Sequence, residues 1–249
     1  MKLLLVAADA MEFPGILSHA REVRPARVAV DWARQAKLGD DDVLLVANGA
    51  GEKRAAAAVD SALASFDADA VVSTGFCGAL DPEMHIADIV VANEILVANE
   101  IIVANQILIA NQIQASRRRF PVLSPNAGSP HHMGVVCSID HVAQTSAEKR
   151  ILRGQGASAV EMEAGGVAER AQAHGKGFYC VRVVTDLAGE DMANDFNQAL
   201  RPDGHFATMN ILSRTLRDPL VRLPELLRLR NRCVRAARVL GDFIADCRF

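Results

Sequence analysis

The stretch VLLVANGAGEKRAAAAVDSALASFDADAVVSTGFCG, residues 43–78, holds one complete strand–helix–strand unit. Two apolar runs, Val43–Ala47 and Ala70–Ser73, each end in a glycine-containing turn, and an alanine-rich segment over Lys53–Ser65 separates them. Short, continuous apolar runs of this kind are typical of strands buried on both faces of a sheet. The stretch therefore predicts an α/β protein.

The same alternation continues on both sides of this unit. It predicts further strands at Lys2–Ala8, Val135–Ser138, Ala159–Glu161 and Tyr179–Thr185, and further helices at Phe13–Arg21, Ala147–Arg153 and Glu163–His174. This pattern is that of a mostly parallel sheet with helices on both faces. Ligands bind at the carboxyl ends of the strands in such sheets, so we expect the site at that edge.

Length and composition exclude several classes of protein. The chain has 249 residues and a formal net charge of −3, which fits one sizeable α/β domain and gives no general affinity for nucleic acid. Five scattered cysteines, without a Cys-x-x-Cys pair, indicate a reducing cytoplasm. The seven histidines lack metal-ligand spacing, so we expect no metal. No apolar run reaches the roughly 20 residues of a membrane span, and the first apolar run is too short for a secretory signal.

Three acids occur at predicted strand ends. Glu12 follows the first strand, Glu163 begins a helix, and Asp186 ends an apolar strand. A carboxylate in such a place can act as acid, base or hydroxyl anchor, and each one alone could equally stabilise the next segment's N-terminus. Three such acids at one edge of the predicted sheet favour a catalytic role. The Gly49–Gly51 turn is either a tight turn or an anion site, and it matches neither phosphate-binding glycine motif.

Three segments resemble the nucleoside phosphorylase/nucleosidase superfamily, and within it the methylthioadenosine/S-adenosylhomocysteine nucleosidases. They are STGFCGALDPEMHIADIVVA (Ser73–Ala92), AVEMEAGGVA (Ala159–Ala168) and VRVVTDLA (Val181–Ala188). The resemblance covers about residues 1–200. It implies a three-layer α/β/α phosphorylase-like fold with a mostly parallel, mixed central sheet, and a cofactor-free cytoplasmic enzyme, a dimer, that releases the base of an adenine-type purine nucleoside.

The resemblance also implies roles for individual residues. Asp186 corresponds to the acid that protonates the purine N7, and Glu12 to the acid that activates the attacking water. The transition state is oxocarbenium-like, so it needs both a neutralised leaving base and a nucleophile on the other face. The implied substrate-binding residues are Glu163 at the ribose hydroxyls, Met162 on the sugar face, Arg182 and Thr185 near Asp186, and Phe76, Cys77 and Gly78 in the glycine turn.

Departures from the family pattern bear on the nucleophile. Family phosphorylases hold phosphate with an arginine where this chain has Ser73, and with a glycine/arginine loop after the first strand, which is missing here. Phe76 replaces a serine usual in the nucleosidases. Hydrolysis is therefore favoured over phosphorolysis. If the enzyme were a phosphorylase, Arg54 would be the residue that binds phosphate. Two further functions stay open: a hopanoid-associated phosphorylase acting on a lipophilic adenosyl substrate, and a non-catalytic nucleoside-binding or assembly protein.

Residues 90–113 are four near-copies of one hexapeptide: VVANEI, LVANEI, IVANQI and LIANQI. Successive side chains on a strand point to opposite faces, and each copy has an even number of residues. Every copy on a strand would therefore present the same positions to the same face, with Val91, Asn93 and Ile95 on one side. Copies two to four, residues 96–113, read as an insertion that forms an extended strand or hairpin arm. A β-helix coil or an α-helix would also accommodate the repeat. In the nucleosidases, the segment at this place covers the 5′ substituent of the substrate. Because the insertion replaces that segment, the sequence does not predict the 5′ substituent.

The C-terminal residues 214–249 carry nine arginines and four acids. Apolar residues recur there at steps of three or four from Leu226, with arginines on the opposite side, which predicts a basic amphipathic helix. This helix either packs on the domain with a solvated basic face or contacts a membrane surface. The predicted organisation is a catalytic domain over 1–213 followed by this helical tail.

Overall fold

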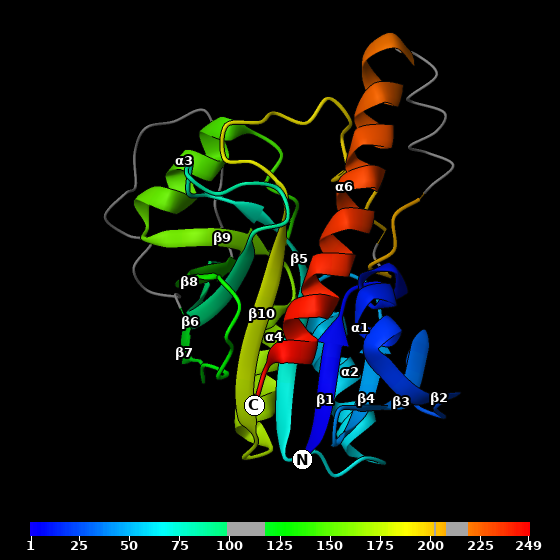
Figure 1. Cartoon of the computed structure of the whole chain (residues 1–249). Coiled ribbons are helices and arrows are strands. Elements are labelled where there is room, and N and C mark those ends of the chain that lie inside the picture. Colours follow the sequence, from blue (N-terminus) through cyan, green and yellow to red (C-terminus); the bar gives the residue numbers. More distant parts are fainter. Residues whose placement is uncertain (99–117, 202, 208–218) are drawn as a thin grey trace.

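The computed structural model describes residues 1–98, 118–201, 203–207 and 219–249 (Figure 1). Its strands are β1 (Lys2–Ala7), β2 (Ala20–Pro25), β3 (Trp32–Leu38), β4 (Asp41–Ala47), β5 (Ala70–Ala79), β6 (Ile89–Val97), β7 (Arg118–Pro121), β8 (His132–Ser138), β9 (Ala157–Glu161) and β10 (Gly177–Asp186). Its helices are η1 (Ala10–Glu12), α1 (Pro14–His19), α2 (Glu52–Leu63), α3 (Ser146–Gly154), α4 (Ala164–Ala173) and α6 (Pro219–Asp246).

The strands form one mixed sheet, part of which closes on itself. β5 pairs with β10, β10 with β6, β6 with β8, β8 with β9, and β9 again with β5, so five strands make a ring. From β5 the sheet continues through β1, β4, β3 and β2. The neighbours β4, β1, β5 and β10 run parallel, as predicted, whereas β2 and β3 add antiparallel pairs at the edge.

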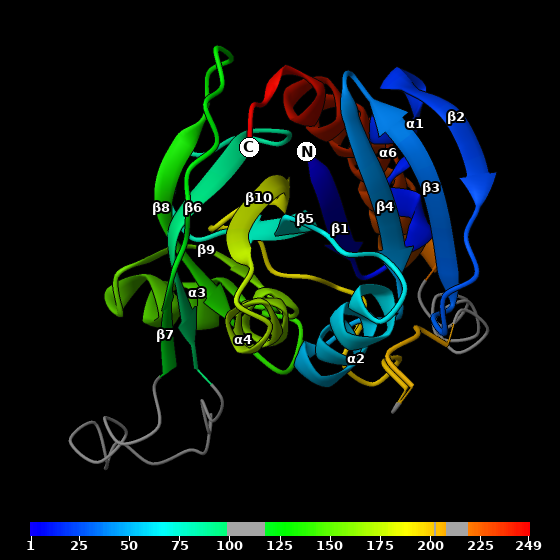
Figure 2. The same cartoon turned by 90° about the horizontal axis from the view of Figure 1, so that it is seen from below.

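Helices cover both faces of this sheet, which is the predicted three-layer arrangement (Figure 2). On one face Leu4 and Val46 belong to the core cluster of α2 and α4, and on the other face Leu3 and Leu45 belong to that of α1 and α6. Alternate residues of one strand thus enter opposite layers, which explains why the strands read as continuous apolar runs.

The first hexapeptide copy lies in β6, but its faces differ from the prediction. The register of β6 against β8 shifts between Ala92 and Glu94, so Asn93 is the extra residue of a β-bulge. Beyond the bulge Ile95 packs in the same core cluster as Ala92, and not with Val91. The predicted alternation is wrong here because one inserted residue exchanges the two faces.

The predicted insertion 96–113 is described only at its beginning. Leu96 and Val97 are buried and end β6, where they pair with β7. These two residues therefore belong to the sheet and not to an appendage. Residues 99–113, and with them the predicted repeat arm, lie outside the described residues.

The C-terminal segment forms the expected helix, α6, over Pro219–Asp246. Its second half is buried through Ala237, Leu240 and Ile244 against α1 and the sheet, so this part is an integral layer of the domain. Among the described residues, no helix has the length and apolarity needed to cross a bilayer.

Helices α1 and α6 touch through glycines, which leads to a prediction for stability. A Cβ atom at Gly241 would lie 2.0 Å from the carbonyl carbon of Gly15. Gly241→Ala is therefore expected to lower the free energy of unfolding by about 1–3 kcal/mol, because the helices must separate. Chemical denaturation measures this. Gly154→Ala is the control, since nothing lies within 4 Å of its Cβ position; equal effects of both changes would contradict the prediction.

Candidate functional site

A cavity of about 560 Å³ lies where β1, β5, β9 and β10 end. Eight of the nine residues predicted for the site line it: Glu12, Phe76, Cys77, Gly78, Met162, Glu163, Thr185 and Asp186. They come from four segments that are far apart in sequence. The parallel strands β1, β5 and β10 bring three of the segments together because their carboxyl ends meet at one edge. The fourth segment follows β9, which is antiparallel to β5 and pairs Val160 with Gly78.

The carboxylate of Glu12 is held by three backbone N–H groups. Its Oε2 accepts from Ala8 at 2.9 Å and from Asp9 at 3.0 Å, and its Oε1 accepts from Phe76 at 2.7 Å. Gly75 makes this approach possible, since its φ is +130° and a Cβ there would lie 2.3 Å from Oε1. Burial raises the pKa of Glu12 above its ordinary value, against the lowering effect of the N–H donors. A buried carboxylate of this kind suits a general base.

Arg182 is the predicted residue that does not line the cavity. It is fully buried, and its guanidinium donates to Ser73 Oγ at 2.6 Å and to the Thr74 carbonyl at 3.1 Å. It also pairs with Glu161 at 2.5 Å and lies 3.6 Å from Glu163. Nη1 and Nη2 thus contact protein acceptors, whereas Nε has no partner within the described residues. Arg182 lies behind Glu161 and Glu163, which line the cavity.

Glu161 and Glu163 form a buried acidic pair. Glu163 Oε1 accepts the N–H of Gly51 at 3.0 Å, and Glu161 Oε2 accepts the N–H groups of Glu163 and Ala164, both at 2.8 Å. Glu161 Oε1 is buried and lacks a partner within the described part of the chain. Burial and then the charge of Glu161 raise the pKa of Glu163 to about 8. The cavity wall therefore carries a carboxyl group, that of Glu163, that is mainly protonated at neutral pH.

This raised pKa makes the stability of the fold depend on pH. Between the ordinary pKa of 4.5 and about 8, folded Glu163 holds a proton that the unfolded chain has released. We therefore expect this contribution to stability to be complete below pH 4.5 and to be lost as pH rises to about 8. Thermal unfolding of the wild type and of Glu163→Gln across this range checks it: the variant should show the smaller decline. Parallel curves would contradict the prediction.

Lys149 on α3 contacts Asp186 and was not identified from the sequence. Its side chain is fully buried, and its ammonium pairs with Asp186 Oδ1 and donates to the Leu187 carbonyl at 2.8 Å. The hydroxyl of Thr185 lies 3.4 Å from the other oxygen, Oδ2. Asp186 is thus fixed by a charge on one oxygen, and it lines both cavities described here. The sequence carries no local signal for this contact, because 37 positions separate Lys149 from Asp186.

His141, at the rim of the cavity, is a second residue that the sequence did not indicate. Its Nε2 bonds to Glu148 at 2.5 Å and its Nδ1 bonds to Asp140 at 2.7 Å. The bond to Glu148, followed by that to Asp140, raises the pKa of His141 to about 9. The imidazole is therefore charged at neutral pH.

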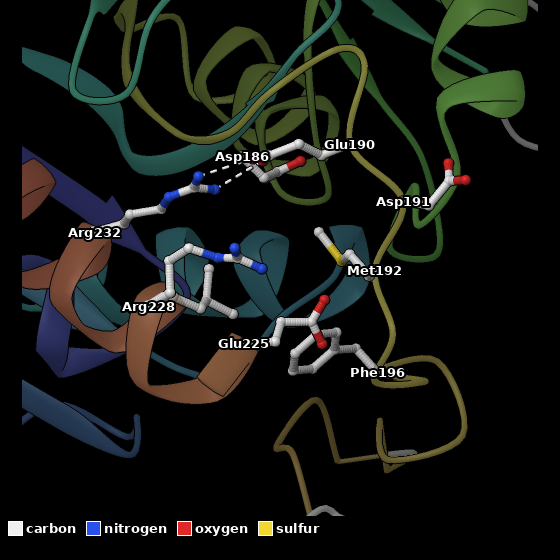
Figure 3. A pocket seen from close by; sticks show the side chains of 9 residues that line it. Asp186, Glu190, Asp191, Met192, Phe196, Glu225, Arg228 and Arg232 are labelled. Atoms are coloured by element: carbon white, nitrogen blue, oxygen red, sulfur yellow. Dashed lines mark hydrogen bonds and ion pairs between the residues drawn. The ribbon is translucent and has the colours of Figure 1, made fainter. Parts of the chain in front are cut away.

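The first part of α6 forms one wall of the site. The large cavity is bounded there by apolar side chains: Leu226, Leu229 and Cys233 of α6, with Met192, Phe196 and Phe206 of the preceding loop. A smaller cavity of about 260 Å³ adjoins Asp186; Figure 3 shows Arg228 and Arg232 on one side of it, and Met192 and Phe196 on the other. Arg232 binds Glu190 through two hydrogen bonds of 2.7 and 2.8 Å.

The glycine turn at 49–51 is not an open anion site. Its N–H groups donate to the Ala8 carbonyl, to the Gly204 carbonyl and to the carboxylate of Glu163. Arg54, the alternative phosphate clamp, donates to the Asn48 carbonyl and pairs with Asp31. No cluster that could hold a metal ion is found in the described ranges.

Comparisons with known proteins place this cavity in context. The model of the phosphorylase superfamily matches residues 2–210. A 5′-methylthioadenosine/S-adenosylhomocysteine nucleosidase of Glaesserella parasuis is 26% identical over 80% of this chain and 92% of its own length, and that of Oceanobacillus iheyensis is 22% identical over 86% and 98%.

Solved structures of this fold superpose along almost the whole chain. The nucleosidase of Neisseria meningitidis, in complex with methylthio-immucillin-A, has a TM-score of 0.70 at 19% identity and covers 98% of this chain and 97% of its own. Futalosine hydrolase of Helicobacter pylori has a TM-score of 0.70 at 16% identity, with coverage of 98% and 96%. At these identities the likeness establishes the fold.

Proposed function

The chain belongs to the phosphorylase superfamily and is an enzyme, and we propose that it cleaves the N-glycosidic bond of an adenine-type nucleoside with water as the nucleophile. One observation carries the choice of water: the N–H groups of the loop after β1 already bind the carboxylate of Glu12. An anion in this loop would have to displace a buried carboxylate. A homodimer in the cytoplasm, implied by the family resemblance, is part of the proposal.

In the proposed reaction the two ends of the cavity act on opposite sides of the ribose. Asp186 donates a proton to N7 as the C1′–N9 electron pair moves into the purine, so the base leaves neutral. Glu12 takes a proton from the water that attacks C1′. Glu163 holds the ribose hydroxyls and Met162 packs on the sugar. Charge developed in a buried site of this kind is stabilised by groups already in position.

Lys149 supports the acid in this scheme. After the proton has moved to N7, Asp186 is a carboxylate, and the ammonium on its Oδ1 stabilises that charge. Because Lys149 occupies Oδ1, Oδ2 is the oxygen that faces the base. Lys149 acts on the substrate only through Asp186, so it is a positioning residue.

The product formed in the presence of phosphate tests the proposal. Methylthioadenosine, S-adenosylhomocysteine, adenosine and inosine are incubated with the enzyme, with and without phosphate, while free base and sugar are followed. We expect free ribose or its 5′-substituted form, and a rate that phosphate changes less than twofold, a limit of about 0.4 kcal/mol in barrier height. Ribose 1-phosphate as the main product would overturn hydrolysis while leaving nucleoside cleavage intact.

The second candidate is a phosphorylase that acts on a lipophilic adenosyl substrate. The observation that favours it is the apolar wall built by Leu226, Leu229 and Phe196 beside the reacting groups. Adenosines that carry 5′-alkylthio groups of increasing length distinguish this candidate. If the wall receives the 5′ group, kcat/KM should rise by up to about fourfold per methylene, because each buried CH₂ is worth about 0.8 kcal/mol. A flat series would exclude it.

A further inference from the structure

The first half of α6 carries a row of exposed apolar side chains. Their exposed fractions are 87% for Leu220, 45% for Leu223, 52% for Leu227 and 64% for Val234. Spacings of three, four and seven place these four residues on one side of the helix. We call them the leucine row. Figure 1 shows this half of α6 extending beyond the sheet, whereas the second half packs on the domain.

Arginines border the leucine row on both sides. Arg228 and Arg235 follow one edge of the row, and Arg230 lies on the other edge; all three are exposed, and Arg228 and Arg230 also line the smaller and the larger cavity. Within the described residues none of the three has an ion-pair partner. Glu225, the acid of this half of the helix, already accepts the N–H groups of Ala193 and Asn194. The surface is therefore apolar along its centre and positive at its edges.

A neighbouring side of the same helix faces the large cavity. Leu226, Leu229, Arg230 and Cys233 line that cavity. At 3.6 residues per turn, Leu226 lies only about 60° around the helix from Leu223 of the leucine row. The exposed row therefore begins beside the cavity wall, on the same helix.

We propose that the first half of α6 docks on the surface of an anionic lipid bilayer. The leucine row enters the boundary between headgroups and acyl chains, and the flanking arginines bind lipid phosphates. A second copy of the chain fits this surface less well. Pairing two leucine rows about a twofold axis would bring their unpaired arginines together, and like charges repel. The inference rests on this surface alone and does not depend on the reaction catalysed.

Cosedimentation of the full chain with vesicles tests the proposal. Phosphatidylcholine vesicles are compared with vesicles that also contain phosphatidylglycerol, at low and high salt. We expect binding to the second kind, weakened by salt. Arg228→Gln with Arg235→Gln should reduce the partition coefficient roughly 30-fold, from about 1 kcal/mol per arginine. Leu220→Ser with Leu227→Ser should reduce it roughly 100-fold.

Matched variants elsewhere on the surface serve as controls. Arg27→Gln with Arg150→Gln removes the same charge, and Val23→Ser removes an apolar side chain that is 45% exposed; both should bind vesicles as the wild type does. Absence of binding to anionic vesicles would overturn the proposal, as would equal losses in the control variants. Light scattering measures the oligomer mass of the wild type and of the variant changed at Leu220 and Leu227. If the variant has a lower mass and the wild type does not bind vesicles, a second copy of the chain covers the leucine row, and the proposal is overturned.

Discussion

Replacing Asp186 with asparagine is expected to lower the rate of base release by about 10²- to 10⁴-fold while substrate binding is largely kept. Asparagine has the same size and still fits beside Thr185, but it cannot give a proton to the purine. Without that proton the base must leave as an anion. Single-turnover rates measure the chemical step, and titration with a slowly cleaved nucleoside measures binding.

Asp67→Asn is the matched control for this substitution. The side chain of Asp67 is 88% exposed and pairs with Lys176, and it precedes β5 at the end away from the cavity, so its change should leave most of the turnover. Lys149→Gln tests the role of the Lys149 charge while Asp186 itself is kept. This variant should have a lower rate and also a shifted pH profile, because the positive charge beside Asp186 is removed. An Asp186→Asn enzyme that keeps more than half of the wild-type rate would remove the assignment.

The second large effect is expected at Glu12. Glu12→Gln removes the base, for which we expect a loss of about 10²- to 10⁴-fold in rate. In the wild type the carboxylate accepts hydrogen bonds from backbone N–H groups, whereas glutamine would turn an NH₂ group toward some of these donors. A buried donor left without an acceptor costs about 1–3 kcal/mol of stability. The rate at saturating nucleoside and the midpoint of thermal unfolding should both fall.

The pH profile gives a further check on Glu12. Because burial raises its pKa, the wild-type rate should increase as pH rises through that value and Glu12 ionises. This rising limb should be absent from Glu12→Gln. The exposed Glu83→Gln is the control and should change neither rate nor profile. If the limb persists in Glu12→Gln, another group is the base.

The sequence predicted the centre of the fold better than its edges. The buried strands β1, β4 and β10 have continuous apolar runs, and they form as expected. β5 also forms, but it continues to Ala79 through the segment that was predicted to be a glycine turn. The segment Ala20–Leu38 has no such run, because β2 and β3 lie at the exposed edge and carry charged residues; the hairpin they form was not predicted. The bulge at Asn93 was also missed, since a one-residue register shift depends on the facing strand β8.

For the site, sequence patterns indicated residues at the ends of strands, but they did not indicate the buried contacts of those residues with other side chains. Glu12 and Asp186 stand where strands end, and both line the cavity. Arg182 lies within a strand, and its bonds to Ser73 and Glu161 depend on how three strands pack. Lys149 meets Asp186 across 37 positions of sequence, a contact that no local spacing expresses. Three-dimensional packing determines those partners.

Strand β7 lies outside the five-strand ring and pairs with β6. The residues that flank their connection, Val97 and Arg118, are partners in that pairing, so its two ends are held side by side. Each doubling of a connection's length costs only about 0.6 kcal/mol in closure entropy. A longer connection at this point is therefore expected to cost the fold little stability. We expect the same junction to accept an inserted affinity tag or reporter domain.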